Sequence, residues 1–273
     1  MKVSIITVCY NAEKTIQETI ESVLNQTYKD FEYIIQDGSS SDNTMKIVEE
    51  YAERFRNARI KYRYESEPDT GIYNAMNKAT SKANGEWCIY MNADDSFYSN
   101  RVLQEVFEDN DYEGYDAVFG AYCRHDEKNK YVFQSEAIDI IPRKMPFVHQ
   151  TIFVRTNVFR NYGYDEQYRL CADYDAFFKM YADGRRFRQI PNVVSNYSVS
   201  GASGESNIDA LEETIQIQKK HSDQYPISFE RRIRWKMKKL YLMAKNQIPE
   251  STMIILRKAK AVFITRILKK DTM

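Results

Sequence analysis

The sequence predicts an α/β fold: a mostly parallel sheet flanked by helices, a mixed-sheet region built onto it, and C-terminal helices. Apolar strand-like runs alternate with helical patterns over the first hundred residues, which is typical of right-handed βαβ units. Beyond residue 100 the strand signals follow one another more closely, which indicates a mixed sheet. With 43% hydrophobic and 29% charged residues, the 273-residue chain has the composition of an ordinary globular protein.

The first hundred residues carry strand signals separated by helical ones. Residues 3–10 form an apolar, β-branched run, after which apolar residues recur at helical spacing with Asn11 as the expected helix cap. A polar turn at 37–42 opens the second helix, which we expect to end near residue 55. The expected strands are 3–10, 33–36, 60–64 and 87–91, and the other expected helices are 13–26 and 72–83.

The remainder of the chain predicts a second half and a helical extension. Expected helices are 102–107 and 174–181, and expected strands are 117–122, 131–134, 151–154, 187–190 and 193–198. A small-residue loop at 201–204 is expected to end the α/β body, before helical patterns at 208–221, 229–245 and 251–269. We therefore expect a domain at 1–204, with halves at 1–100 and 101–204, and an extension at 205–273.

Charge and cysteine content disfavour several classes of protein. The formal net charge is zero, and no aromatic-basic recognition motif is present, so we expect no nucleic-acid partner. The four cysteines show no C-x-x-C spacing, which predicts reduced thiols in a cytoplasmic protein. We find no signal-peptide pattern and no apolar run long enough to span a bilayer.

Polar residues follow each predicted strand of the first half. Because the carboxyl ends of parallel strands meet at one edge of a sheet, we expect these residues to converge on a nucleotide. A single aspartate in such a turn more often caps a helix, but four clusters in register favour a ligand site. The clusters are Thr7, Tyr10 and Asn11; Asp37 with Ser39; Asp69; and Asn92, Asp94 and Asp95.

Two adjacent carboxylates, Asp94 and Asp95, come just past the buried strand at 87–91. Carboxylates at such a position are unfavourable unless they are solvated, paired or bound to a cation. Hard oxygen ligands suit Mg²⁺ or Mn²⁺, and such an ion is commonly shared with substrate phosphates. The sequence thus predicts a metal–diphosphate site. The alternative is a solvated turn in which one of the two aspartates caps the helix near Arg101.

The second half contains two further candidate groups. Asp173 lies at the start of a predicted helix, where the helix dipole stabilises a carboxylate. It either caps that helix or acts as a general base towards an acceptor hydroxyl. His149 and Gln150 precede a predicted strand, and the alternatives for His149 are a substrate contact and a structural histidine.

Two common nucleotide-binding classes lack their motifs in this chain. No Gly-x-Gly-x-x-Gly follows the first strand, and no Gly-Lys-Ser/Thr loop is present. The sequence therefore disfavours dinucleotide oxidoreductases and P-loop enzymes.

An ordered series of motifs resembles that of family 2 glycosyltransferases. The motifs are VSIITVCYN at 3–11, SVLNQTY at 22–28, DGSSSDNT at 37–44, DTGIYNAMNKA at 69–79, GEW at 85–87, NADD at 92–95, HQT at 149–151 and DYD at 173–175. The resemblance covers about residues 1–200. It implies a GT-A fold, in which a Rossmann-like nucleotide-binding body continues into a mixed-sheet acceptor region.

The resemblance also implies roles for individual residues on the nucleotide side. Thr7, Tyr10, Asn11 and Asp37 resemble the wall that holds the nucleotide base, and Asp69 resembles a further uridine contact. The segment 92–95 occupies the place of the Asp-x-Asp element, which touches the ribose and a divalent cation, Mn²⁺ or Mg²⁺. Its first position here is Asn92 instead of Asp, so the division of roles between Asp94 and Asp95 stays open.

On the acceptor side, Asp173 resembles the catalytic base of the family. The family often has Glu-Asp at this place and the chain has Ala172-Asp173, so Asp175 remains a competing candidate. His149 and Gln150 are further acceptor-side candidates. The implied reaction is inverting transfer of a sugar from a nucleotide-sugar, with a UDP-sugar as the expected donor, to a hydroxyl of a glycan or lipid-linked acceptor in bacterial surface-polysaccharide biosynthesis.

Two other classes of function serve as alternatives. A nucleotidyltransferase that makes sugar nucleotides should carry a Gly-rich, basic loop after the first strand, and residues 9–12 are unlike one. A catalytically silent scaffold of a polysaccharide synthase complex would bind a nucleotide and tolerate the loss of Asp173. The intact carboxylates favour the glycosyltransferase.

The C-terminal tail differs in charge from the rest of the chain. Residues 231–270 hold 13 lysine and arginine residues against one acidic residue, Glu250, with apolar residues between them at helical spacing. Basic amphipathic helices lie on anionic membrane surfaces, so we expect peripheral contact with the inner face of the cell membrane. The alternative is that these helices pack on the body or on a second subunit, and the sequence leaves the oligomeric state open.

Overall fold

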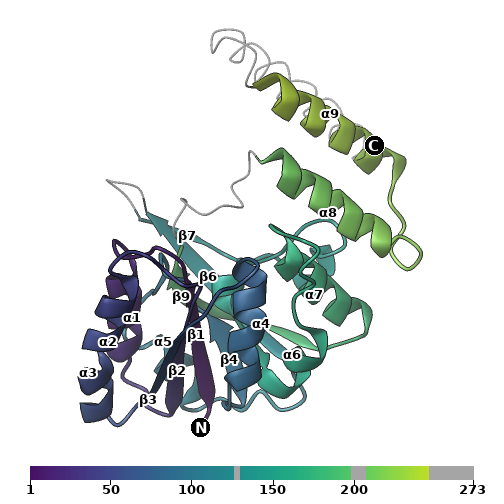
Figure 1. Ribbon diagram of the computed structural model, residues 1–273. Helices are drawn as coiled ribbons and strands as arrows, with labels where there is room; N and C mark the ends of the chain where they lie inside the picture. The colour runs from purple at the N-terminus through teal and green to yellow at the C-terminus, as the bar shows by residue number, and fades with distance from the viewer. Residues whose placement is uncertain (126–129, 198–206, 246–273) are drawn as a thin grey trace.

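A computed structural model describes residues 1–125, 130–197 and 207–245, and it places helices on both faces of one sheet (Figure 1). The strands are β1 (Val3–Cys9), β2 (Phe31–Asp37), β3 (Lys61–Ser66), β4 (Trp87–Tyr90), β5 (Ser96–Phe97), β6 (Ala117–His125), β7 (Lys130–Phe133), β8 (Ile152–Arg155) and β9 (Phe187–Asn196). Their order in the sheet is β3-β2-β1-β4-β8-β6-β9-β5, with β7 paired to β6.

The α-helices of the described residues follow the βαβ order in the first half and form a separate pair at the C-terminal end. They are α1 (Ile16–Leu24), α2 (Thr44–Glu50), α3 (Ala52–Asn57), α4 (Ile72–Lys82), α5 (Val102–Phe107), α6 (Thr156–Tyr162), α7 (Ala172–Ala182), α8 (Ile208–Lys220) and α9 (Phe229–Lys245).

The sheet is parallel on one side of β4 and mixed on the other. β1 pairs in parallel with β2 and β4, and β2 pairs in parallel with β3. Beyond β4 the sheet continues through antiparallel β8 and β6, then through β9, which is parallel to β6. Both the parallel first half and the mixed second half predicted from the sequence are confirmed. The carboxyl ends of β1 to β4 consequently share one edge.

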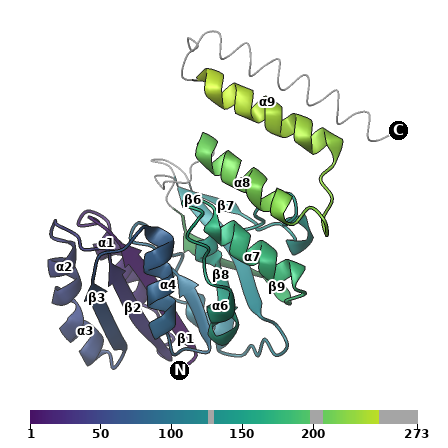
Figure 2. The ribbon, with the colours of Figure 1, turned by 45° about the vertical axis from the view of Figure 1, so that its right-hand side comes forward.

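Two hydrophobic clusters cover the two faces of the sheet. On one face α1, α2, α3 and α5 pack against alternate residues of β1, β2 and β4. On the other face α4, α6 and α7 pack against the residues between them, as Figure 2 shows from a second direction. Every residue of β1 and β2 is buried, because helices cover both sides of these strands. This double burial explains the continuous apolar runs in the sequence.

The helix pair α8–α9 lies outside this three-layered body (Figures 1 and 2). α8 packs beside α7 and buries Leu211 and Ile217, whereas α9 packs mainly against α8. Within residues 1–125, 130–197 and 207–245, no helix combines the length and the apolar character needed to cross a membrane. The predicted helix at 251–269, the loop at 201–204 and with it the boundary at residue 204 lie outside the described residues.

Two expectations for the helices of the first half were wrong. Asn11 does not cap α1, which begins at Ile16 after Thr15. Asn11 instead has a left-handed backbone, with φ of 49°, and its side chain accepts a hydrogen bond from Ser41 N–H. The helix expected to run to residue 55 is divided into α2 and α3 at Tyr51.

The two strands predicted at 187–190 and 193–198 form the single strand β9. Pro191 has no N–H to donate to a ladder, and the pairing of β9 with β6 shifts register around it. Gly120 of β6 leaves room for this irregularity, because a Cβ at Gly120 would lie 2.4 Å from the carbonyl oxygen of Asn192. Pro191 interrupts the strand pattern of the sequence, so the pattern predicts two strands. In the structure the strand continues through Pro191 with an irregular register, as at a bulge.

Candidate functional site

The carboxyl ends of β1 to β4 and the loops that follow them form one polar edge of the sheet. We use "polar edge" for Asn11, Asp37, Asp69, Asn92, Asp94 and Asp95, which end or follow these strands. The parallel pairing of the four strands brings the residues to the same side, as the sequence predicted.

Asp37 ends β2 and is completely buried, yet its carboxylate is fully hydrogen bonded. It accepts from the N–H of Ser40 at 2.9 Å and from the hydroxyls of Ser40 and Ser66 at 2.5 and 2.6 Å. The Cys9 thiol lies 3.5 Å away, and burial together with the charge of Asp37 raises the pKa of Cys9. Cys9 therefore stays protonated, and Asp37 fixes the loop between β2 and α2.

The loops after β1 and β2 are held together by reciprocal hydrogen bonds. Asn11 N–H donates to the Ser40 hydroxyl at 2.7 Å, and the Asn11 side-chain oxygen accepts from Ser41 N–H at 2.9 Å. Asn11 and Ser39 both have positive φ, 49° and 64°, in a sparsely populated region of backbone space. Such strain at two adjacent loops is common where backbone is held in place for a ligand.

The absence of a side chain at Gly38 lets Asp69 and Tyr10 approach the backbone closely. A Cβ at this glycine would lie 2.5 Å from Asp69 Oδ2 and 3.5 Å from the Tyr10 ring. Asp69 is fixed by the N–H of Gly71, which donates to its Oδ1 at 2.9 Å, and the Tyr10 side chain is 66% exposed. An exposed ring next to a carboxylate that can still accept hydrogen bonds is suited to a planar base with N–H groups.

Thr7 does not present its side chain at the polar edge. It is fully buried, and its hydroxyl lies 2.6 Å from the Met91 carbonyl and 2.9 Å from the Tyr33 hydroxyl. These bonds join the middle of β1 to the segment after β4. The structure therefore gives Thr7 a place in the framework of the sheet.

Asp94 and Asp95 differ in burial after β4. Asp94 is exposed, whereas Asp95 is only 3% exposed and its Oδ2 accepts a hydrogen bond from Gln150 at 2.6 Å. The Thr19 hydroxyl of α1 lies 2.7 Å from the Asp95 carbonyl, which fixes the turn against that helix. The alternative that one aspartate caps the next helix is wrong, because no side chain caps α5.

His149 connects the polar edge to the start of α7. Its Nε2 lies 2.9 Å from Asn92 Nδ2, and its Nδ1 lies 3.4 Å from Asp173 Oδ2. In the tautomer that accepts from the Asn92 amide at Nε2, the Nδ1 proton is directed towards Asp173. His149 and Gln150 form one turn of 3₁₀ helix (His149–Thr151) before β8, and they contact Asn92 and Asp95, respectively.

Asp173 lies in the first turn of α7 but does not cap it, because Cys171 occupies that position. Its Oδ1 accepts from Tyr174 N–H at 2.8 Å and lies 3.2 Å from the Tyr73 hydroxyl, whose proton it shares with the Leu170 carbonyl at 3.0 Å. The Asp173 side chain is 18% exposed. Burial, with the charge of Asp173 added to it, raises the pKa of Tyr73 well above its usual range. Tyr73 therefore remains a hydrogen-bond donor that orients this carboxylate.

Asp175 is directed away from this site. Both of its carboxylate oxygens accept from Lys220 of α8, at 2.9 and 3.0 Å, and its side chain is 5% exposed. Between the two acidic candidates on α7, only Asp173 faces His149 and the polar edge. Asp175 thus holds α8 against α7 through Lys220.

The residues that support Asp173 carry no recognisable pattern in the sequence. Glu213 of α8 accepts hydrogen bonds from the backbone N–H groups of Arg169, Leu170 and Cys171, each at 2.9 Å. These groups lie directly before α7, so α8 holds the segment that leads to Asp173. No local pattern marks Glu213 or Tyr73, because each acts on a residue far away in the sequence.

The acidic residues of the polar edge fit a cation that is shared with a substrate. Within the described ranges, no group of three or more His, Cys, Asp or Glu side chains is arranged to hold a metal ion. Asp94 and Asp95 nevertheless offer hard carboxylate oxygens, and Asn92 Oδ1 is buried without a hydrogen-bond partner. One or two carboxylates with substrate phosphates are a common set of ligands for Mg²⁺. The donor set is therefore compatible with such an ion.

Known proteins that are similar to this chain identify its family. The family described as "Glycosyl transferase family 2" matches residues 4–182. The "PGL/p-HBAD biosynthesis glycosyltransferase" of Mycobacterium tuberculosis is 29% identical over 209 residues, which cover 76% of this chain and 80% of the relative. The "Putative glycosyltransferase EpsE" of Bacillus subtilis is 29% identical over 192 residues, 68% of either chain.

Solved structures of low sequence identity share the fold. S. aureus TarS 1–349 in complex with UDP-GlcNAc aligns with a TM-score of 0.66 at 19% identity, over 90% of this chain and 73% of that one. The mannosyltransferase PcManGT from Pyrobaculum calidifontis, in complex with GDP-Man and Mn²⁺, aligns with a TM-score of 0.64 at 16% identity, over 96% and 80%. The predicted GT-A architecture is confirmed.

Proposed function

The chain belongs to glycosyl transferase family 2, and from this membership we propose an inverting transfer of a sugar from a UDP-sugar to an acceptor hydroxyl. The acceptor we propose is a glycan or a lipid-linked glycan of the cell surface. We further propose that residues 1–204 carry the reaction and that residues 205–273 form a membrane-directed extension of a cytoplasmic enzyme.

One observation carries this proposal: a single imidazole joins the two halves of the site. His149 contacts Asn92 of the polar edge and Asp173 of α7, which come from opposite halves of the chain. A displacement reaction needs the leaving group on one side of the anomeric carbon and the base on the other. Because the His149 imidazole contacts both the donor side and the base side, the site is arranged for a reaction between two substrates. Nucleotide binding alone would not need this link.

In the proposed reaction Asp173 is the general base. Its carboxylate removes the proton from the acceptor hydroxyl as that oxygen attacks the anomeric carbon. The bond to the nucleoside diphosphate breaks on the opposite face, so the configuration is inverted in a single displacement. Tyr73 donates to this carboxylate and His149 Nδ1 lies 3.4 Å from it, so the two side chains together hold it in one orientation. No covalent nucleophile is required.

On the donor side each residue of the polar edge has a proposed task. Tyr10 and Asp69, which lie next to each other at Gly38, would contact the uracil base, and Asn11 and Asp37 fix the two adjoining loops. Asn92 Oδ1, which is buried without a hydrogen-bond partner, would accept from a ribose hydroxyl when the donor binds. Asp94 and Asp95 would hold a divalent cation, Mn²⁺ or Mg²⁺, which supplies positive charge next to the diphosphate.

A donor panel tests the proposal. Binding and hydrolysis of UDP-, GDP- and dTDP-sugars would be measured with Mn²⁺, with Mg²⁺ and with EDTA. We expect metal-dependent turnover of one UDP-sugar and its loss in Asp95→Ala. If folded protein bound a nucleotide but turned over no donor with either metal, the catalytically silent scaffold would replace the enzyme. If it bound no donor with either metal, the proposed donor site would be wrong.

A further inference from the structure

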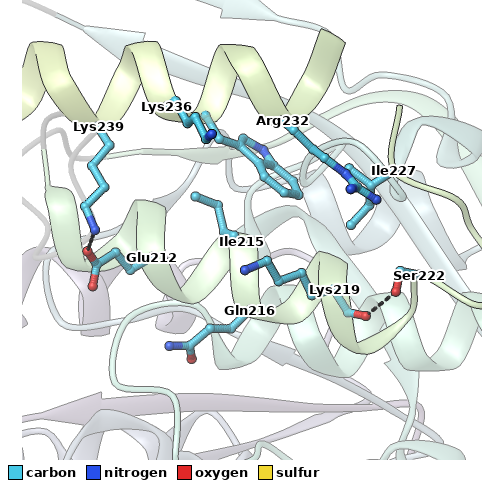
Figure 3. Close-up of a pocket in the computed structure, with 10 residues that line it drawn as sticks. Glu212, Ile215, Gln216, Lys219, Ser222, Ile227, Arg232, Lys236 and Lys239 are labelled. Carbon is cyan, nitrogen blue, oxygen red and sulfur yellow. Dashed lines mark hydrogen bonds and ion pairs between the residues drawn. The ribbon is translucent and has the colours of Figure 1, made fainter. Parts of the chain in front are cut away.

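A cleft of about 630 Å³ separates α8 from α9, outside the site described above (Figure 3). Its lining combines apolar and cationic side chains from both helices. Ile215, Ile227 and Trp235 supply the apolar part, and Lys219, Arg232 and Lys236 supply positive charge. Such a combination is suited to a ligand that is anionic at one end and apolar at the other.

Most of the cationic side chains that line the cleft have no counter-ion among the described residues. Lys239, at the edge of the cleft, pairs with Glu212 at 2.6 Å. Across residues 1–125, 130–197 and 207–245, no ion pair is formed by Lys219, Arg232 or Lys236. Three cations around one cleft repel one another, and an anion bound between them would relieve that repulsion.

A second observation indicates which kind of anion the cleft receives. α9 exposes an apolar stripe of Phe229, Ile233, Met237, Leu240 and Met243, which are between 38% and 78% exposed. Their spacing of three or four residues places them along one side of the helix. Arg232 and Lys236 directly precede two members of the stripe, so the cations lie between the stripe and the cleft. Exposed apolar surface bordered by cations is typical of a helix that lies in a membrane interface.

We propose that the α8–α9 cleft binds the phosphate headgroup of an anionic lipid while the α9 stripe enters the membrane interface. Lys219, Arg232 and Lys236 hold the phosphate oxygens, for which guanidinium and ammonium groups are suitable donors. Ile215, Ile227 and Trp235 contact the apolar carbons next to the headgroup. This deepens the membrane-directed role proposed above, on which it rests.

The opposite face of α8 links this cleft to the catalytic base. Glu213 and Lys220 hold the segment before α7 and Asp175, respectively, whereas Ile215 and Lys219 face α9. A bound lipid would therefore be separated from the Asp173 helix by α8 alone, a width of about 10 Å. The enzyme would then present its base close to acceptors anchored in the same membrane.

The test compares two variants of the full chain that remove the same charges from different sides of α9. Arg232→Gln/Lys236→Gln alters the cleft, and Arg234→Gln/Lys238→Gln alters residues that do not line it. Binding to vesicles of phosphatidylcholine, with and without phosphatidylglycerol, would be measured by co-sedimentation. We expect binding only with phosphatidylglycerol and an affinity about tenfold weaker for the cleft variant than for its control. If both variants lost the same amount of vesicle affinity, the cleft would not be the binding site. Diffuse positive charge on the surface would then explain the binding.

Tryptophan fluorescence gives a second reading of the same site. The chain has two tryptophans, and Trp87 is fully buried in the body, so changes report on Trp235. We expect vesicles with phosphatidylglycerol to shift Trp235 emission to the blue. The same shift with inorganic phosphate alone would overturn a lipid ligand. No shift, with emission already blue in the free chain, would show that another segment fills the cleft, and a concentration-dependent dimer by sedimentation would assign it to a second copy.

A third measurement separates this proposal from the proposed activity. Donor hydrolysis without vesicles should be equal in the cleft variant and in the unaltered protein, because no cleft residue contacts the polar edge. If hydrolysis were absent in both while vesicle binding behaved as expected, the proposed function would fail and the lipid site would stand. Melting temperatures of both variants verify that each is folded.

Discussion

The end of β4 and the start of α7 each carry two closely spaced carboxylates, and the protein treats the two pairs differently. After β4, the buried Asp95 remains beside the site through Gln150, and Asp94 is exposed next to it. On α7, Asp173 faces His149, while Asp175 turns to Lys220 of another helix. Both members of the first pair thus stay at one site, and the second pair is divided between two surroundings.

The difference follows from the local backbone. Asp94 and Asp95 lie in a turn, where neighbouring side chains can be directed to the same region. Residues two apart on an α-helix point in nearly opposite directions, since each residue advances about 100°. Asp173 and Asp175 consequently cannot serve one site. Two acidic residues that lie one or two positions apart can therefore serve the same site in a turn, but not in a helix.

The largest change in kcat is expected for the pair Asp173 and Asp175. Asp173→Asn should lower kcat about 10³-fold, because an amide cannot accept the acceptor proton, while the donor Kd stays within about threefold. Asp175→Asn should keep kcat within about fivefold and lower the melting temperature, because it weakens the bond to Lys220. Steady-state kinetics with donor-binding titrations would measure both. Equal losses of kcat in the two variants would contradict the division.

The pair after β4 should behave as one unit in activity but not in stability. Asp94→Asn and Asp95→Asn should each lower kcat/KM about 10²-fold at fixed Mn²⁺, since each removes a carboxylate next to the diphosphate. Only Asp95→Asn should lower the melting temperature, because Asp95 is buried against Gln150. Mn²⁺ titration of activity with parallel thermal unfolding would decide this. A fully active Asp94→Asn would show that Asp94 is merely solvated.

His149 links the two pairs, so its substitution tests whether they are coupled. His149→Ala should lower kcat about 30-fold with little change in the donor KM, because Asp173 loses a contact that orients it without leaving the site. His149→Asn retains a donor near the Nδ1 position and should recover part of kcat. Identical kcat for the two variants, or a rise in KM alone, would make His149 a substrate contact instead.

The smallest effect concerns the stability supplied by Lys220. Its pKa is raised: burial alone would lower it, but the hydrogen bonds to Asp175 and its charge outweigh burial. A raised pKa means that the stabilisation is present below the usual lysine pKa of about 10.4 and is lost as pH rises through the folded-state value. Lys220→Met should therefore cost about 0.5–1 kcal/mol between pH 6 and about 9, given its partial exposure.

Urea unfolding at several pH values would measure this cost. The difference between Lys220→Met and the unaltered protein should shrink above about pH 10.5. A difference that grows with pH would mean that packing of the lysine stem, and not its charge, stabilises α8 on α7.

Periodicity located the framework of the fold because each strand and helix is covered in a regular way. The strands at 3–10, 33–36 and 87–91 are recognisable as apolar runs since helices bury both of their faces. Thr7 shows the limit of such reasoning, because alternation along β1 turns its hydroxyl to Tyr33 in the core and not to the polar edge. Whether a side chain near the end of a strand faces the core or the polar edge depends on the strand twist and on the neighbouring strands.

The sequence by itself determined the class of the protein: parallel strands whose carboxyl ends carry polar residues must bring those residues to one edge. Only the tertiary structure decided how they are used. His149 meets Asn92 across 57 positions and Tyr73 meets Asp173 across 100, contacts that exist because β8 and α4 pack beside β4 and α7. Short-range patterns are set by local backbone preference, whereas the orientation of a carboxylate is set by whichever distant group supplies its hydrogen bond.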